Sequence, residues 1–274
     1  MPNPMLNERT LEKAPQTWAP PERRSDHFPP PITDGPISPW KSKVMTVNGV
    51  ISATAVLFVL LLASATFGWN QTGVEYDPVT GDPEYGFPTL AWVGMIVGIG
   101  LVFLLMFRPH LAKFIAPVYA IAQGFFVGAI SKMYETWYDG IVVQAAGATI
   151  AVFGVMLVLY RTRIIKVTNR FRKIVISATI GVMVFYGVCL LIQLFAGSDA
   201  VSFLSSPSLL GIAFSVFVAG LAAFNLALDF DFIERGAQQG LDKDFEWYAA
   251  FGLLVTIIWL YLEMLRLLAK LREH

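Results

Sequence analysis

Few residues in this chain could carry catalytic or metal chemistry. The 274-residue sequence has one cysteine and three histidines, and all three histidines fall at tail or loop positions. The single cysteine, Cys189, excludes a disulfide within the chain and a cysteine-based metal site. A zinc-binding His-Glu-x-x-His motif, a nucleophile elbow and a phosphate-binding loop are all missing from the sequence. We therefore expect a protein that is not an enzyme and that needs no cofactor.

Charged side chains are scarce as well. Only 15% of the residues are charged and the formal net charge is zero, so nothing in the composition points to a nucleic-acid partner. Apolar side chains make up 55% of the chain, which exceeds the share in ordinary soluble domains. They are grouped into runs of about 18 or more residues, long enough to cross a lipid bilayer. The sequence predicts an all-α membrane protein.

The polar N-terminus differs from the rest of the chain. Ten of the sixteen prolines lie in residues 1–40, among charges of both signs. Such a composition cannot bury enough apolar surface to fold alone, so residues 1–44 are predicted to be a disordered Pro-rich tail. Residues 45–274 form the predicted membrane domain. Its seven candidate spans are Thr46–Phe67, Leu90–Phe107, Phe114–Met133, Ile141–Tyr160, Ile174–Ala196, Leu209–Leu228 and a last one that starts between Trp247 and Gly252.

Positive charge alternates along the connections between these spans. Basic residues occur in the tail and in the second, fourth and sixth connections, whereas the first and fifth have none and the third has only Lys132. The positive-inside rule then predicts a cytoplasmic N-terminus in a plasma membrane. Seven crossings would place Arg266, Lys270 and Arg272 outside, against the rule. Either these side chains snorkel to the interface or the last helix does not fully cross.

Two local patterns concern packing and helix ends. Glycines recur at four-residue spacing, as in Gly94/Gly98 and Gly124/Gly128, and this spacing lets helix backbones approach closely. In the sixth span the apolar pattern continues beyond Leu228, and Gly236 is the predicted stop signal. Asp229 is therefore predicted to lie inside that helix.

Asp229 and Glu263 are acidic residues within the predicted membrane spans, where acidic residues are rare. A charged side chain at the centre of a bilayer costs roughly 2.5–3.5 kcal/mol on insertion scales, so each carboxyl group needs a partner. For Glu263 one candidate is Arg266, three residues on and on the same helix face. The other is Asp229 itself, because two adjacent carboxyl groups cannot both ionise cheaply and can share one proton. Asp231 faces elsewhere, since it lies about 200° around the helix from Asp229.

Several ordered blocks of the sequence resemble the Bax inhibitor-1 family of membrane proteins, and its actinobacterial branch in particular. The resemblance runs from about residue 45 to the end of the chain. It is carried by APVYAIAQGFFVGAISKMYE (116–135), GIVVQAAGATIAVFGVMLVLYRTRIIKVTNRF (140–171), LALDFDFIERG, and EWYAAFGLLVTIIWLYLEMLRLL near the C-terminus.

The resemblance implies a fold in which six helices surround the seventh, with a proton sensor made of two aspartates on helices six and seven. Asp229, in L-D-F-D-F-I, falls on the first of these positions and Glu263, in L-Y-L-E-M, on the second. This chain thus has an Asp–Glu pair where many relatives have two aspartates. Gln123 stands where close relatives have an acid. No basic residue lies between Leu90 and Phe107 to match the relatives' helix-two arginine, so its contact with the helix-six aspartate is either missing here or rebuilt with Arg266.

Two functions are therefore expected, of which the first is preferred. Bacterial relatives are described as pH-sensitive calcium leak channels, and calcium favours carboxylate oxygen, so Asp229 and Glu263 would bind the ion and sense pH. The alternative is a regulatory protein that does not transport ions and instead binds a membrane protease, a role that the long tail would suit. In a third interpretation the two acids only hold helices six and seven together.

Overall fold

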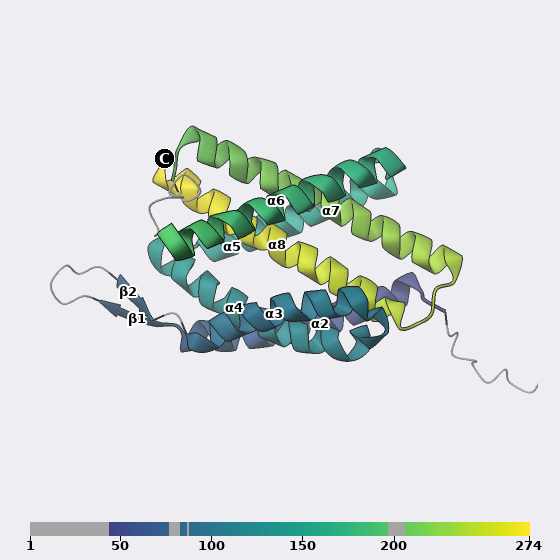
Figure 1. Cartoon of the computed structure of the whole chain (residues 1–274), viewed down its shortest axis with the longest axis horizontal. Helices are drawn as coiled ribbons and strands as arrows, with labels where there is room; N and C mark the ends of the chain where they lie inside the picture. The colour runs from purple at the N-terminus through teal and green to yellow at the C-terminus, as the bar shows by residue number, and fades with distance from the viewer. Residues whose placement is uncertain (1–43, 77–82, 87, 197–205) are drawn as a thin grey trace, which may run out of the picture. The chain divides into compact units, whose positions relative to one another are not determined.

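The computed structural model describes residues 44–76, 83–86, 88–196 and 206–274 of the chain. Seven helices in these residues are long and apolar enough to cross a membrane, so the predicted all-α membrane fold is confirmed. The predicted tail, residues 1–44, lies outside the described residues except for Val44. The helices, shown in Figure 1, are α2 (Val47–Gln71), α3 (Thr89–Phe107), α4 (Ala112–Trp137), α5 (Ile141–Arg161), α6 (Asn169–Ala196), α7 (Leu209–Gln239) and α8 (Phe245–Glu273), with a short 3₁₀ helix η2 (Pro109–Leu111) before α4.

Several helix ends differ from the predicted ones, and α8 begins at Phe245, before the predicted start between Trp247 and Gly252. The helix α7 does not stop at Gly236 but continues to Gln239, where Gly240 adopts a left-handed conformation with φ of 67°. A glycine in this conformation is a common helix terminator. Gly236 lies inside the helix instead, and a Cβ there would come within 2.8 Å of the Met45 sulfur. At α6 the helix begins at Asn169, five residues before the predicted start, because the Thr168 hydroxyl accepts a hydrogen bond from the Phe171 backbone N–H at 3.2 Å.

The connection between α2 and α3 contains a short β-hairpin that the sequence analysis did not anticipate. Strands β1 (Gly73–Tyr76) and β2 (Pro83–Gly86) pair antiparallel, with Gly73 opposite Gly86. It extends from the same end of the helices as the α4–α5 connection (Figure 1).

Glycines allow α2 and α3 to pack closely on α4. A Cβ on Gly128 would lie 2.0 Å from the Ala65 carbonyl oxygen of α2, and one on Gly94 would lie 2.5 Å from the Ala122 carbonyl oxygen of α4. Gly124 and Gly98 are equally crowded, by Ser64 and Gln123. The predicted small-residue spacing therefore does mark the helix contacts.

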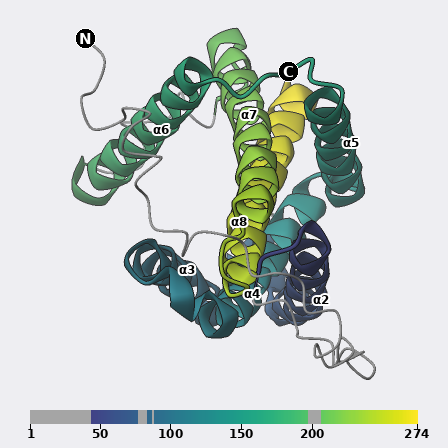
Figure 2. The same ribbon diagram turned by 90° about the vertical axis from the view of Figure 1, so that its right-hand side faces the viewer.

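The last helix contacts several others. It packs directly against α7, α2, α5 and α4, and Figure 2 shows it among these four helices. Side chains of α6 also reach it, since Tyr186 hydrogen-bonds Glu263. The expected surrounding of the last helix by all six others stays a prediction.

The first turn of α8 is joined to the start of α2 by a buried acid. Glu246 is 5% exposed, and its Oε1 accepts hydrogen bonds from the Thr46 backbone N–H at 3.0 Å and the Thr46 hydroxyl at 2.9 Å. A carboxylate at a helix N-terminus is favoured by the helix dipole. A Cβ on Gly49 would lie 2.0 Å from the same oxygen, so the glycine makes room for this carboxylate.

The three C-terminal basic side chains have partners inside the protein. Lys270 is 2% exposed and donates to the Gly211 carbonyl at 3.0 Å and to the Ser215 hydroxyl at 2.9 Å. Arg272 donates to the Asp139 carbonyl, and Arg266 to Glu263. The 29 residues of α8 span roughly 43 Å at 1.5 Å per residue, enough to cross a bilayer. The three basic residues near the C-terminus are therefore compatible with a last helix that is long enough to cross the whole bilayer.

The close packing of α2 on α4 predicts a sharp contrast between two glycines. Gly128→Ala should lower the free energy of unfolding by about 1–3 kcal/mol, because its new methyl group meets a backbone carbonyl that cannot rotate away. Gly147→Ala is the matched control on α5, where a Cβ meets no atom within 4 Å. It should leave stability unchanged or raise it by up to about 1 kcal/mol. Thermal unfolding in detergent measures both, and equal stability of the two variants would contradict the packing.

Candidate functional site

Asp229, on α7, faces α8 at a glycine. The residue is partly buried, and its Oδ2 atom is the one shielded side-chain oxygen or nitrogen without a hydrogen-bond partner among the described residues. A Cβ on Gly252 would lie 3.8 Å from Asp229 Oδ1. The Thr256 hydroxyl, one turn farther along α8, donates to the Gly252 carbonyl at 3.2 Å. The sequence prediction that Asp229 lies within its helix is confirmed.

Asp229 lines a cavity of about 510 Å³. The cavity lies between α6, α7 and α8, at the end of the helices that carries the α5–α6 and α7–α8 connections. Its wall is polar at few positions and otherwise apolar. The lining residues are Arg172, Ile176, Leu228, Asp229, Phe232, Arg235, Gly236, Gln239, Leu241, Tyr248, Ala249, Phe251 and Gly252.

A second cavity, of about 440 Å³, follows one helical turn farther along the same three helices. Asn225 and Thr256 line it, and each lies four residues from a wall residue of the first cavity, Asp229 and Gly252 respectively. Asn225 Nδ2 donates to Thr179 Oγ1 at 2.8 Å, which joins α7 to α6 across this level. The remaining lining residues are Val182, Met183, Tyr186, Val255 and Trp259. Asp229 thus lines the first cavity and lies one helical turn from Asn225, which lines the second.

Glu263 lies beyond the second cavity and is only 2% exposed. Arg266 Nη1 is 3.0 Å from Glu263 Oε1, and the Tyr186 hydroxyl of α6 donates to the same oxygen at 3.2 Å. Arg266 also donates to the Tyr186 hydroxyl at 2.6 Å, and its guanidinium lies 5.2 Å from the centre of the tyrosine ring. Of the two candidate partners of Glu263, Arg266 is thus the one that contacts it in the structure. Tyr186 was missed, although a tyrosine in an apolar span needs a partner for its hydroxyl group.

The structure does not bring Asp229 and Glu263 into contact. No hydrogen bond or ion pair joins them in the described part of the chain, and Glu263 lies 11 residues beyond Gly252, about 16 Å along α8. The described residues also contain no group of three or more His, Cys, Asp or Glu side chains that could hold a metal ion. One calcium ion bound by both acids is therefore not what this arrangement provides. Their assignment as a proton sensor stays a prediction.

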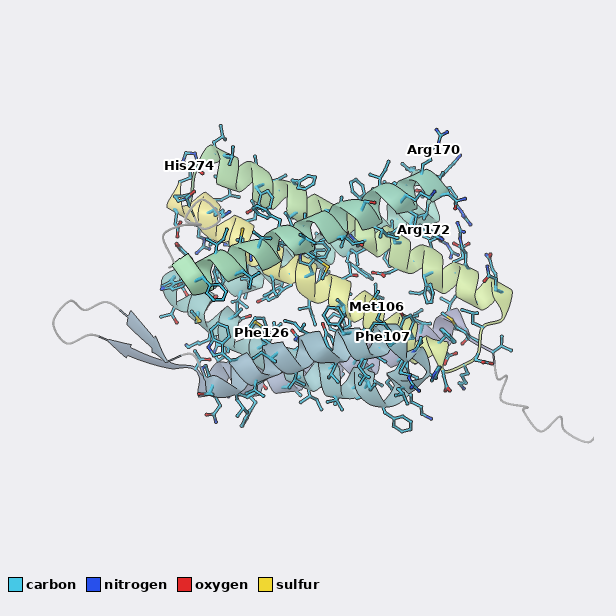
Figure 3. The ribbon with its side chains drawn as sticks, in the orientation of Figure 1. Met106, Phe107, Phe126, Arg170, Arg172 and His274 are labelled. Carbon is cyan, nitrogen blue, oxygen red and sulfur yellow. The ribbon has the colours of Figure 1, made fainter. Side chains whose placement is uncertain are left out.

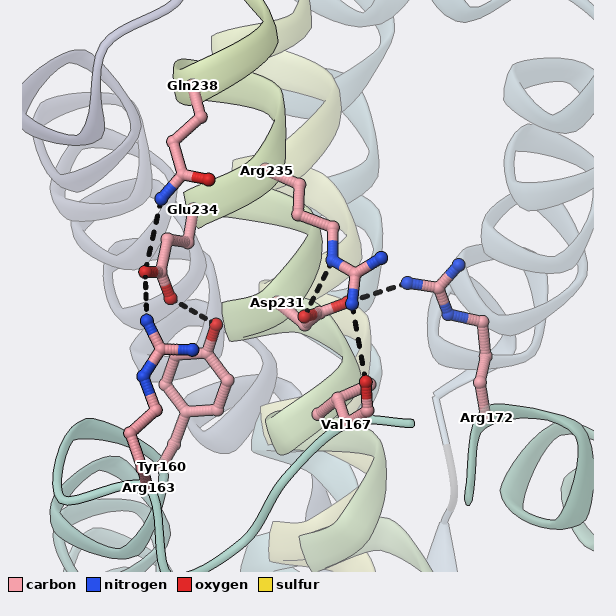
Figure 4. Close-up of polar contacts among 8 residues, drawn as sticks. All are labelled: Tyr160, Arg163, Val167, Arg172, Asp231, Glu234, Arg235 and Gln238. Atoms are coloured by element: carbon pink, nitrogen blue, oxygen red, sulfur yellow. Dashed lines mark hydrogen bonds and ion pairs between the residues drawn. The ribbon is translucent and has the colours of Figure 1, made fainter. Parts of the chain in front are cut away.

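Asp231 belongs to a separate network at the end of α7. It is 5% exposed and binds Arg172 Nη2 of α6 at 2.6 Å and Arg235 Nε at 2.9 Å (Figure 4). Arg235 also donates to the Val167 carbonyl at 3.3 Å. As predicted, Asp231 faces away from Asp229. It supports the site indirectly, because it attaches the first turn of α6 and the preceding connection to α7.

Glu234 extends this network on the other side of α7. Arg163 Nη2 lies 2.7 Å from Glu234 Oε1, and Tyr160 donates its hydroxyl hydrogen to the other carboxylate oxygen (Figure 4). Gln238 donates to Glu234 as well. Two acids of α7 thus hold the strongly basic α5–α6 connection against the helix bundle.

Gln123, which stands where close relatives have an acid and was therefore a possible supporting residue of the site, is buried in α4. Its amide nitrogen donates to the Gly94 carbonyl of α3 at 3.4 Å. No contact in the described part of the structure links it to Asp229 or Glu263. The position joins α3 to α4.

The ion pair of Glu263 predicts a strongly non-additive double-mutant cycle. Arg266→Gln leaves a buried carboxyl group without its cation and should cost about 3–5 kcal/mol of stability. Glu263→Gln/Arg266→Gln removes both charges and should recover most of that loss. The exposed pair between Arg163 and Glu234 is the control, and Arg163→Gln should cost at most about 1 kcal/mol. Unfolding in detergent measures all three, and simply additive losses for Glu263→Gln and Arg266→Gln would contradict the coupling.

Comparison with known proteins adds a family to this geometry. None of the curated proteins searched matches the chain. A sequence profile of the family described as Bax inhibitor 1 like matches residues 3–273, almost the whole chain. The seven membrane-spanning helices agree with the fold expected from the resemblance. The chain belongs to the Bax inhibitor 1 like family of membrane proteins.

Proposed function

We propose that the protein is a passive, pH-sensitive leak pathway for cations, calcium in particular, between α6, α7 and α8. The observation that carries this proposal is the unpartnered carboxyl oxygen of Asp229, a residue that lines the first cavity and lies one helical turn from the wall of the second. A buried polar atom without a partner is costly, and such atoms in a native structure call for an explanation. A transient cation or a proton at Asp229 supplies one.

The polar groups that line the two cavities suit a hydrated or partly dehydrated cation. Calcium binds carboxylate, carbonyl and amide oxygens, and it retains waters when protein ligands are few. Asp229 supplies one carboxylate, and Asn225 and Thr256 supply neutral polar groups one turn away. An ionised Asp229 attracts a cation into the cavity. A protonated Asp229 is neutral and no longer does so, which makes entry of the ion sensitive to pH.

In this proposal, the ion pair between Glu263 and Arg266 is the barrier to the passage of the cation. Arg266 holds its positive charge against Glu263 and Tyr186 at the far end of the second cavity. A cation that reaches this level meets a carboxylate already neutralised by a guanidinium. Passage therefore requires Arg266 to leave Glu263, and the described structure corresponds to the closed state.

This arrangement predicts that Asp229→Asn flattens the pH dependence of calcium flux. The amide keeps the size of the side chain but cannot ionise, so the flux should no longer rise as the carboxyl group loses its proton. Flux into proteoliposomes containing the purified protein, measured across pH, tests this. Asp242→Asn is the control, because Asp242 is an exposed acid in the α7–α8 connection outside both cavities. A wild-type pH profile for Asp229→Asn would remove Asp229 from the mechanism.

We also propose a plasma-membrane location, with the α5–α6 connection on the cytoplasmic side because residues 161–173, which include this connection, carry six basic residues. Single cysteines at Lys166 and Gly73, both exposed, should then react with an impermeant thiol reagent from opposite sides. The background is Cys189→Ala, which removes the buried native cysteine. Labelling of both positions from one side would overturn the orientation.

A further inference from the structure

The first cavity has a feature that an ion pathway does not need. Two arginines, Arg172 and Arg235, line it at the ends of α6 and α7, while most of its remaining wall is apolar. Their side chains are 40% and 44% exposed. A cavity for a small hydrated cation gains nothing from two guanidinium groups. Such groups instead suit a bound anion.

Both arginines keep hydrogen-bond donors free for a ligand. A guanidinium has five N–H donors, and Asp231 accepts from one nitrogen of each arginine. Arg235 spends one more donor on Val167. Asp231 offsets one of the two guanidinium charges, and the other is offset only when Asp229, in the same wall, is ionised. Arg170 and Lys173 flank Arg172 in α6, outside the lining of the cavity, and have no acidic partner among the described residues. Figure 3 shows Arg170 and Arg172 projecting from this end of α6.

The apolar part of the cavity wall runs parallel to the helices, and so into the depth of the membrane. From Arg235 to Leu228, seven residues on, the lining follows α7 for about 10 Å, which is about two thirds of the depth of one hydrocarbon leaflet. Ile176 and Phe232 of this wall are 44% and 38% exposed. A soluble anion would bind the arginines but leave this apolar surface uncovered.

We propose that this cavity binds one anionic phospholipid, with its phosphate at Arg172 and Arg235 and an acyl chain along Ile176, Phe232 and Leu228. Basic pockets between transmembrane helices near the membrane surface bind anionic headgroups in this manner. Arginine suits the contact because its planar donors match the oxygens of a phosphate group. The lipid site does not depend on ion conduction, so the leak proposal can fail while this one stands.

Retention of lipid by the purified full-length protein tests the site. The protein is incubated with equal amounts of phosphatidylglycerol and phosphatidylcholine in detergent micelles, and bound lipid is counted by native mass spectrometry. The wild type should retain one phosphatidylglycerol in preference to phosphatidylcholine. Arg172→Gln/Arg235→Gln should weaken this retention by about tenfold or more, since both phosphate contacts are lost.

Matched variants separate the cavity from general surface charge and from misfolding. Arg161→Gln/Lys166→Gln removes two exposed positive charges from the same end but outside the cavity, and should retain the lipid. Adding Asp231→Asn to the cavity variant removes the carboxylate left without partners and protects the fold. Ile176→Trp keeps every charge and fills the apolar part of the cavity, so it should also lose the lipid.

Four results would overturn the proposal. These are equal loss in the surface-charge control, undiminished retention by a folded cavity variant, equal retention of the two lipids, or displacement of phosphatidylglycerol by millimolar glycerol phosphate. The last would show that the site takes a soluble phosphate rather than a lipid. The proposal is supported if only the cavity variants lose the lipid and if glycerol phosphate does not displace phosphatidylglycerol from the wild type.

Discussion

The structure depends on how charge is held inside an apolar helix bundle. An ionised side chain in a low-dielectric interior is tolerated only when other groups satisfy it. Glu263 is satisfied by Arg266 and Tyr186, and Asp231 by Arg172 and Arg235. Lys270 forms no ion pair among the described residues and relies on a carbonyl and a hydroxyl of α7. The Glu263–Arg266 and Asp231–Arg235 pairs lie within one helix, but the contacts of Tyr186, Arg172 and Lys270 each join two helices, so the buried charges help to specify which surfaces meet.

Asp229 is the exception to this pattern, and its surroundings differ accordingly. Where α2 and α3 pack on α4, glycines bring the backbones so close that a methyl group would not fit. Between α6, α7 and α8 the side chains leave two cavities instead. The tightly packed half of the bundle can serve as a rigid support. The half containing the cavities has room for an ion, water or a lipid chain, and this is where the unsatisfied carboxyl oxygen lies.

The sequence determined a large part of the fold. Seven apolar runs predicted the seven helices, because a bilayer-length run has few alternatives to a membrane helix. The i, i+3 spacing placed Arg266 beside Glu263, and the four-residue spacing of glycines identified the contacts of α2 and α3 with α4. The 200° rotation between Asp229 and Asp231 also predicted that the two acids face different partners. All of these are relations within one helix, or properties of one helix face, and helix geometry sets them without any knowledge of neighbours.

Only the tertiary structure decided the relations between helices. The distance between Asp229 and Glu263 depends on how far α7 is shifted along α8, and no local pattern encodes that shift. The same holds for Tyr186 at Glu263, for Ser215 at Lys270, and for Glu246 at the start of α2, where residues 46 and 246 meet. The two cavities are a further case, since they exist only where side chains of three helices fail to fill the space between them. Helix register and cavity volume result from the packing of many side chains at once, which is why the sequence identified the acids while the fold determined their partners.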